Sequence, residues 1–279
     1  MIPGLTLGTG RLGNPIAGLF GQRPILIGMV HLMPLPGSPG WGGSMRAVLE
    51  RGLADSRALA AAGFDGILIE NFNDHPFYPN EAPQETVAAL AVCAAASAAA
   101  VEIPIGVNLL RNDGPGAMAV AVASGARFIR VNVHTGVMAS DQGWLEGRAH
   151  ETLRLRGRLG QDVRILGDVL VKHAAPLPGA SLEQLAEDTF YRGCADALIL
   201  SGRGTGRPTE LSRIERVRAV VPDAPLFVGS GVTFETLKET AQLADGIIVG
   251  TSISRDEGRA GSGIDPRRAD LFVRAARST

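Results

Sequence analysis

Two short stretches near the C-terminus decide the fold: Pro225-Leu226-Phe227-Val228-Gly229-Ser230-Gly231 and Gly246-Ile247-Ile248-Val249-Gly250-Thr251-Ser252. Each is a continuous apolar run, typical of a parallel strand covered on both faces, followed at once by a turn of small residues. Glycine lets a phosphate oxygen approach main-chain N–H groups because no Cβ is in the way. Paired anion-binding turns of this kind follow the seventh and eighth strands of phosphate-handling (β/α)8 barrels. The predicted phosphate-binding residues are therefore Gly229, Ser230, Gly231, Gly250, Thr251 and Ser252.

Six further apolar, β-branched-rich runs precede these two, so we expect eight strands. They span Ile25–Leu32, Gly66–Asn71, Ile105–Leu110, Phe128–His134, Arg164–His173, Ala197–Ser201, Leu226–Gly229 and Ile247–Gly250. Segments with helical periodicity follow them: Ser44–Ala62, Pro83–Ala100, Gly116–Ser124, Trp144–Leu159, Ser181–Arg192, Glu210–Val220, Thr233–Gln242 and Pro266–Ala276. Eight βα units without a break in composition predict one α/β domain, a single (β/α)8 TIM barrel over residues 24–279, with residues 1–23 as an N-terminal extension. A doubly wound open sheet is the alternative.

The composition narrows the class of protein. The chain has 279 residues, 45% hydrophobic and 20% charged, and a net charge of 27 − 28 = −1, so no global field favours nucleic acid. Its longest apolar stretch, Ala88 to Val101, is shorter than the roughly 20 residues that a membrane span needs, and no secretory pattern opens the chain. Cys93 and Cys194 form no disulfide framework. We expect a cytoplasmic protein with reduced cysteines, without a membrane span or a nucleic-acid partner.

Polar residues gather where the expected strands end, which is where barrel enzymes place their active sites. Arg130, Asn132 and His134 alternate along one expected strand, and Asp168 and Lys172 share one face of the next. Burying such side chains costs several kcal/mol unless they are paired or serve a ligand. The predicted catalytic residues are Lys172, Asp168, Glu70, His134 and His31. The predicted substrate-binding residues are Asn71, Asn108, Arg130, Asn132, Ser201 and Thr205.

Two other interpretations of this polar cluster stay open. The first is a structural layer of salt bridges. The second is a divalent metal held by His31, Glu70, His134 and Asp168, although these residues come from four strands and lack a local ligand spacing. The sequence requires no cofactor, and Gly202–Gly206 lacks the glycine spacing of a dinucleotide fingerprint.

Several motifs at the strand ends also carry a family resemblance. They are Gly28-Met29-Val30-His31-Leu32, Pro34-Leu35-Pro36-Gly37-Ser38-Pro39, Glu70-Asn71-Phe72, Arg130-Val131-Asn132-Val133-His134-Thr135-Gly136, Asp168-Val169, Val171-Lys172-His173-Ala174 and Ser201-Gly202 with Thr205-Gly206. Over nearly all of Pro24 to Ala276 the chain resembles the BtpA/SgcQ family. The resemblance implies a phosphate-binding barrel of the ribulose-phosphate type. Members of the BtpA/SgcQ family are associated with photosystem I biogenesis or with sugar transport and metabolism. Ser254-Arg255 departs from the lysine that members often carry after strand eight.

The sequence therefore leads to three hypotheses about function. The first is an isomerase or lyase that acts on a phosphorylated sugar or related phosphate ester, by acid–base chemistry or through a Schiff base on Lys172. The second is a non-catalytic assembly or stability factor of the photosystem I biogenesis type. The third is a hydrolase of a nucleotide or ribosyl phosphate. In the first and third the partner is a phosphorylated small molecule, and by analogy with other phosphate barrels we expect a homo-oligomer.

Overall fold

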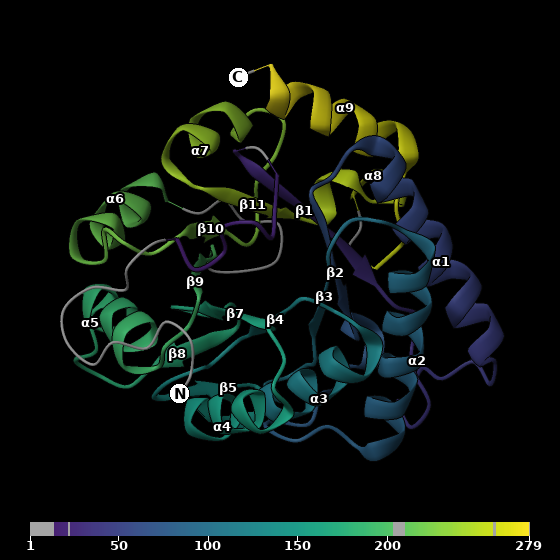
Figure 1. Cartoon of the computed structure of the whole chain (residues 1–279), viewed down its shortest axis with the longest axis horizontal. Coiled ribbons are helices and arrows are strands. Elements are labelled where there is room, and N and C mark those ends of the chain that lie inside the picture. Colours follow the sequence, from purple (N-terminus) through teal and green to yellow (C-terminus); the bar gives the residue numbers. More distant parts are fainter. Residues whose placement is uncertain (1–13, 22, 203–209, 259–260, 279) are drawn as a thin grey trace.

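Eight parallel strands close into a barrel in the computed structural model, which describes residues 14–21, 23–202, 210–258 and 261–278. The strands are β1 (Ile25–His31), β2 (Gly66–Glu70), β3 (Ile105–Asn108), β4 (Phe128–Val131), β7 (Arg164–Asp168), β9 (Ala197–Leu200), β10 (Leu226–Val228) and β11 (Gly246–Val249). Their order around the barrel follows the chain, and β11 pairs with β1 to close it. This arrangement confirms the predicted (β/α)8 fold and excludes the open sheet (Figure 1).

Helices surround the barrel, as Figure 1 shows. They are α1 (Met45–Ala62), α2 (Gln84–Ala100), α3 (Gly114–Ser124), α4 (Ala149–Leu159), α5 (Leu182–Glu187), α6 (Leu211–Val220), α7 (Leu237–Leu243), α8 (Arg255–Gly258) and α9 (Pro266–Arg277). Three single-turn or irregular helices, η1 (Phe72–Asp74), η2 (Asp188–Arg192) and η3 (Thr251–Ile253), complete the set. Local signals fix several ends: the hydroxyl of Ser44 accepts a hydrogen bond from the N–H of Ala47 at the start of α1, and Gly63 ends it with φ 89°.

The barrel interior follows the two-residue period of its strands. Side chains that point inward near the N-terminal ends are apolar, including Ile27, Leu68 and Phe227. Phe20, from the segment before β1, packs edge-on against Phe128 with ring centroids 5.4 Å apart and so closes that end of the barrel. Outward-pointing residues form the larger core between the strands and the helices. Among the described residues, side chains fill this end of the interior, which leaves the C-terminal end for a ligand.

A second, three-stranded sheet was missed by the sequence analysis. It consists of β5 (Val137–Ser140), β6 (Gly143–Glu146) and β8 (Ala174–Pro176), all antiparallel. The prediction that Trp144 begins a helix was wrong, because Trp144 lies in β6 and the helix starts at Ala149. The prediction of a strand from Arg164 to His173 was also wrong at its end. Strand β7 stops at Asp168, and the chain then turns to reach β8.

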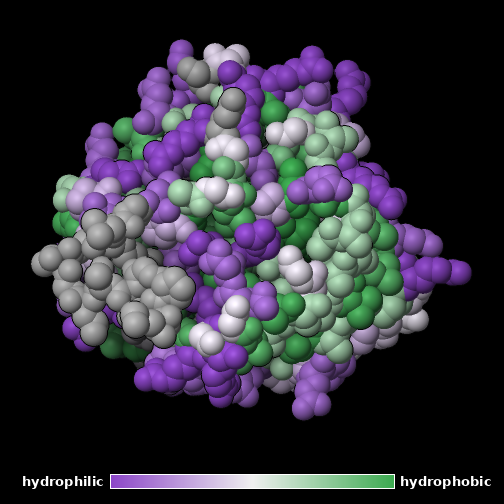
Figure 2. All heavy atoms as spheres, viewed as in Figure 1, coloured by the Kyte–Doolittle hydropathy of each residue, from purple (hydrophilic) through white to green (hydrophobic). Residues whose placement is uncertain are grey.

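The outer surfaces of α2 and α3 are apolar. Helix α2 has no charged residue after Glu85, and α3 has no charged residue at all. Val92 on α2 is 51% exposed. Figure 2 shows these hydrophobic atoms gathered over α2, on the right of the view. No helix in the described part of the chain has both the length and the apolar character needed to cross a bilayer. The expectation that this protein forms a homo-oligomer stays a prediction.

Candidate functional site

The C-terminal layer of the barrel interior is polar. Inward-pointing side chains alternate along each strand and are apolar near its N-terminal end. At the C-terminal ends the inward-pointing side chains are those of His31, Glu70, Asn108, Arg130 and Asp168. Apart from His31, which is partly exposed, these residues are buried. Tertiary position therefore brings together side chains from β1, β2, β3, β4 and β7.

Arg130 and Asp168 form a buried ion pair at the centre of this layer. Nε and Nη2 of Arg130 donate to the two carboxylate oxygens at 3.0 to 3.2 Å, and the side chains are 4% and 0% exposed. Asn132 donates to the same carboxylate at 2.8 Å, and Asn108 donates to Asn132 at 3.2 Å. A fork of this kind fixes the plane of the guanidinium. Asp168 therefore uses most of its acceptor capacity within the protein and holds Arg130 in place.

A cavity of about 100 Å³ opens beside Arg130, and the two glycine-rich turns line its far side. The N–H groups of Ser230, Gly231 and Val232 donate to no acceptor within the described residues. Gly231 has φ 72°, a conformation that favours glycine. A Cβ on Gly229 would lie 2.4 Å from Cγ2 of Ile199, and one on Gly250 would lie 3.0 Å from Cε1 of His31. The turns therefore present uncommitted amides to the cavity, and their glycines stand where a Cβ would clash or where the backbone conformation favours glycine.

Lys172 reaches the same cavity from the turn between β7 and β8. Arg111 donates to its main-chain carbonyl at 2.5 Å, which fixes the turn. The ammonium group forms no hydrogen bond or ion pair with any described residue, although the side chain is half-buried. Burial and the nearby Arg130 lower the pKa of Lys172 to about 8. Lys172 is thus an available cation whose neutral form is within reach near neutral pH.

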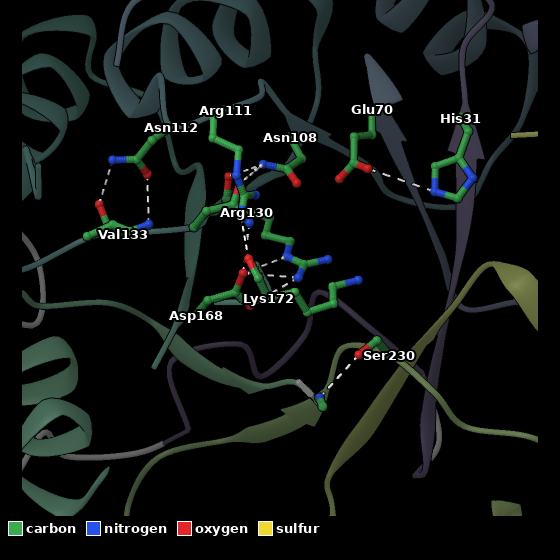
Figure 3. Close-up of polar contacts among 12 residues, drawn as sticks. His31, Glu70, Asn108, Arg111, Asn112, Arg130, Val133, Asp168, Lys172 and Ser230 are labelled. Carbon is green, nitrogen blue, oxygen red and sulfur yellow. Dashed lines mark hydrogen bonds and ion pairs between the residues drawn. The ribbon is translucent and has the colours of Figure 1, made fainter. Parts of the chain in front are cut away.

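Glu70 and His31 face each other across the upper wall of the cavity, with Oε1 and Nε2 3.8 Å apart (Figure 3). Burial raises the pKa of Glu70, against the opposing effects of Arg130 and Lys172. Burial, with Lys172 and Arg130, lowers the pKa of His31 to about 3, so its imidazole is neutral. The ring of Phe72 packs against His31 with centroids 4.5 Å apart. A carboxyl group with a raised pKa beside a neutral imidazole can take up and return a proton.

Several predicted site residues lie outside this cavity. The ring of His134 is hydrogen-bonded to the carbonyl of Gly193, with Nε2 and O 2.7 Å apart, because β4 ends at Val131 and the chain turns away before reaching His134. Asn71 binds the N–H of Leu110 at 2.8 Å and supports a neighbouring loop. Ser201 is fully buried, and its hydroxyl lies beneath Gly229. Thr205 lies outside the described residues.

The four residues of the metal hypothesis do not form one group. No cluster of three or more His, Cys, Asp or Glu suited to a metal ion occurs in the described ranges. Asp168 accepts hydrogen bonds from Arg130 and Asn132, and His134 lies against Gly193. Metal dependence itself stays an untested prediction.

Six residues that line the cavity were not among the predicted site residues: Met29, Phe72, Val232, Thr233, Ile248 and Val249. Phe72 was named only within a motif of the family resemblance, and Val232 was not singled out at all. The signal for Phe72 was its place directly after the strand end Glu70-Asn71, in a loop at the C-terminal end of the barrel, where active sites of such barrels lie. The amide of Val232 carries no side-chain signal at all.

Comparison with known proteins places the chain in a family. The BtpA family model matches residues 22–278. The chain belongs to the BtpA family. The photosystem I biogenesis protein BtpA of Synechocystis sp. is 46% identical over 250 residues, covering 90% of this chain and 87% of the relative. The sgc region protein SgcQ of Escherichia coli is 31% identical, covering 91% of this chain and 95% of its own.

Among solved structures, this BtpA-family chain is similar to N-(5'-phosphoribosyl)anthranilate isomerase from Pyrococcus furiosus. The TM-score is 0.55 over 91% of this chain and all of that enzyme, with 15% sequence identity. At that identity the likeness supports the barrel fold alone.

Proposed function

We propose that this BtpA-family protein is an enzyme that acts on a phosphorylated small molecule at the C-terminal end of the barrel. One observation carries the proposal: uncommitted amides of two glycine-rich turns and the side chains of Lys172, Glu70 and His31 line a single cavity. Phosphate bound to the amides would hold the remainder of the ligand against the ionisable groups. Binding energy from a non-reacting phosphate is a common way to position reacting carbons.

The chemistry that fits this arrangement is proton transfer next to a carbonyl or carboxyl group. In its ionised form Glu70 takes a proton from carbon, and its raised pKa makes it a stronger base than an ordinary carboxylate. The electron pair moves toward the neighbouring oxygen, where Lys172 and Arg130 stabilise the developing negative charge. Return of the proton to another carbon gives an isomerase, and loss of a neighbouring group gives a lyase. The pKa of Lys172 also suits the Schiff-base variant.

A second candidate is a non-catalytic assembly factor, favoured by the name of the Synechocystis relative. The two candidates differ in what the cavity is for. An enzyme needs Glu70 and Lys172, whereas an assembly factor tolerates their replacement as long as its outer surface is intact. The deciding experiment therefore targets the cavity.

The test measures exchange of carbon-bound hydrogen in heavy water. A panel of phosphorylated aldoses, ketoses and acids is incubated with the protein, and mass spectrometry detects deuterium on carbon. We expect at least one compound to gain deuterium, and Glu70→Gln to abolish the gain while inorganic phosphate still binds. Glu239→Gln, on the exposed side of α7, is the matched control.

Binding is scored separately by thermal unfolding. Inorganic phosphate at 100 times its dissociation constant stabilises the protein by about 2.7 kcal/mol, which raises Tm by roughly 5 °C. The proposal is overturned if neither phosphate nor any phosphorylated compound raises Tm. It is also overturned if Glu70→Gln exchanges hydrogen as fast as the unaltered protein.

A further inference from the structure

Two cations in the cavity have hydrogen-bond donors that the protein leaves unused. Asp168 occupies Nε and Nη2 of Arg130, and no described residue accepts a hydrogen bond from Nη1. The ammonium group of Lys172 has no acceptor among the described residues either. Figure 3 shows the two side chains pointing the same way, into the space between the His31–Glu70 pair and Ser230. These donors therefore face the ligand.

The protein also balances only part of the positive charge in the site. Asp168 offsets the charge of Arg130 through direct contact. Glu70 forms no ion pair with Lys172, and burial raises its pKa, which weakens it as a counter-charge. Lys172 is thus a desolvated cation without a fixed partner. A desolvated cation of this kind is costly unless a ligand supplies the opposite charge.

This unmet charge is separate from the phosphate turns. The amides of Ser230, Gly231 and Val232 come from the loop after β10, whereas Arg130 and Lys172 come from β4 and the turn after β7. One tetrahedral phosphate satisfied by the amides leaves the two cations unused. Two adjacent cationic donors match the two oxygens of a carboxylate.

We infer that the ligand of this cavity is a phosphate monoester that also carries a carboxylate, with the phosphate on the glycine-rich turns and the carboxylate against Arg130 and Lys172. The inference rests on the proposed function and names its substrate class. It fits the chemistry above, because a carboxylate beside the reacting carbon is where negative charge gathers when Glu70 removes a proton.

The size of the cavity limits the length of the ligand. A volume of about 100 Å³ corresponds to the space of about three water molecules, at roughly 30 Å³ each. A cavity of this size suits a short ligand, with few carbons between the phosphate and the carboxylate. Phosphorylated three-carbon acids are therefore suitable probes.

The experiment compares two compounds that differ at one carbon. In 3-phosphoglycerate a carboxylate replaces the terminal hydroxymethyl group of glycerol 3-phosphate, and calorimetry gives the dissociation constant of each. We expect 3-phosphoglycerate to bind at least roughly tenfold more tightly, the effect of one additional charge-assisted contact. Lys172→Met should reduce this ratio to about threefold or less. Lys238→Met replaces the chain's other lysine, which is exposed on α7, and should keep the full ratio.

Each outcome decides a different point. Equal affinity of the two compounds for the unaltered protein overturns the carboxylate inference and leaves the proposed function standing. A tenfold ratio that persists in Lys172→Met overturns the assignment of the carboxylate to Lys172. Failure of both compounds and of inorganic phosphate to bind overturns the proposed function itself. The first comparison needs no variant, so it stands even where Lys172→Met fails to fold.

Discussion

Replacing Asp168 with alanine tests whether the Arg130–Asp168 pair holds the site together. The change leaves a guanidinium that is 4% exposed without the three contacts of 3.0 to 3.2 Å that it makes now. Asn132 loses its acceptor at 2.8 Å as well. Removing one partner of a buried ion pair costs about 3–5 kcal/mol, because the remaining charge stays buried and unpaired. We expect Asp168→Ala to lower the free energy of unfolding by that amount.

Urea unfolding of the purified protein measures the loss. Asp270→Ala is the control, since Asp270 pairs with Arg274 on the surface, with side chains 44% and 76% exposed, and should cost at most about 1 kcal/mol. The double variant Arg130→Met with Asp168→Leu removes both charges and should recover much of the loss. A loss below about 1.5 kcal/mol in Asp168→Ala would refute the reasoning. So would a double variant that is no more stable than the single one.

Two further predictions concern the cavity. Gly231→Ala places a Cβ on a residue with φ 72°, so it should cost about 1–2 kcal/mol in urea unfolding and weaken phosphate binding, whereas Gly157→Ala in α4, with no neighbour within 4 Å, should do neither. Burial lowers the pKa of Lys172 from 10.5 to about 8, so between these values the unfolded chain binds more protons and stability rises with pH. Lys172→Met should therefore be more stable than the unaltered protein at pH 7 by roughly 1–3 kcal/mol. Urea titrations should show that this gain in stability shrinks toward pH 10.5. A gain that is constant with pH would contradict the lowered pKa of Lys172.

The strands and the glycine-rich turns after β10 and β11 could be predicted because their signals are local. An apolar run such as Gly246–Val249 is readable from the sequence alone, and so is the small-residue turn that follows it. The inward direction of Arg130 and Asp168 also followed from the two-residue period of a strand. That period holds only as long as the strand does, so the same reasoning failed at His134, beyond the end of β4.

The small sheet of β5, β6 and β8 depended on weaker signals. Ser140-Asp141-Gln142-Gly143 is a plausible hairpin turn between two short runs, and Gly143 has φ 97°. The sequence analysis did not identify this turn and instead predicted a helix from Trp144, where a helical period extends over more residues. Strand β8 pairs with β5 across more than thirty residues of sequence, a contact that no local pattern reports. The sheet matters because β8 sets where the chain goes after Asp168, and hence where Lys172 lies.

Hydrogen bonding at the mouth of the barrel separates groups that are held from groups that are available. The carboxylate of Asp168 accepts hydrogen bonds from Arg130 and Asn132, so it positions the guanidinium and has little capacity left to accept a proton from a substrate. The side-chain carboxyl group of Glu70 and the ammonium group of Lys172 line the cavity, and neither forms a hydrogen bond with any described residue. Sequence position made all three look equivalent, because each is an ionisable residue at or beyond a strand end. The contacts distinguish them: Asp168 holds Arg130 in place, whereas Glu70 and Lys172 are the groups that the proposed chemistry uses.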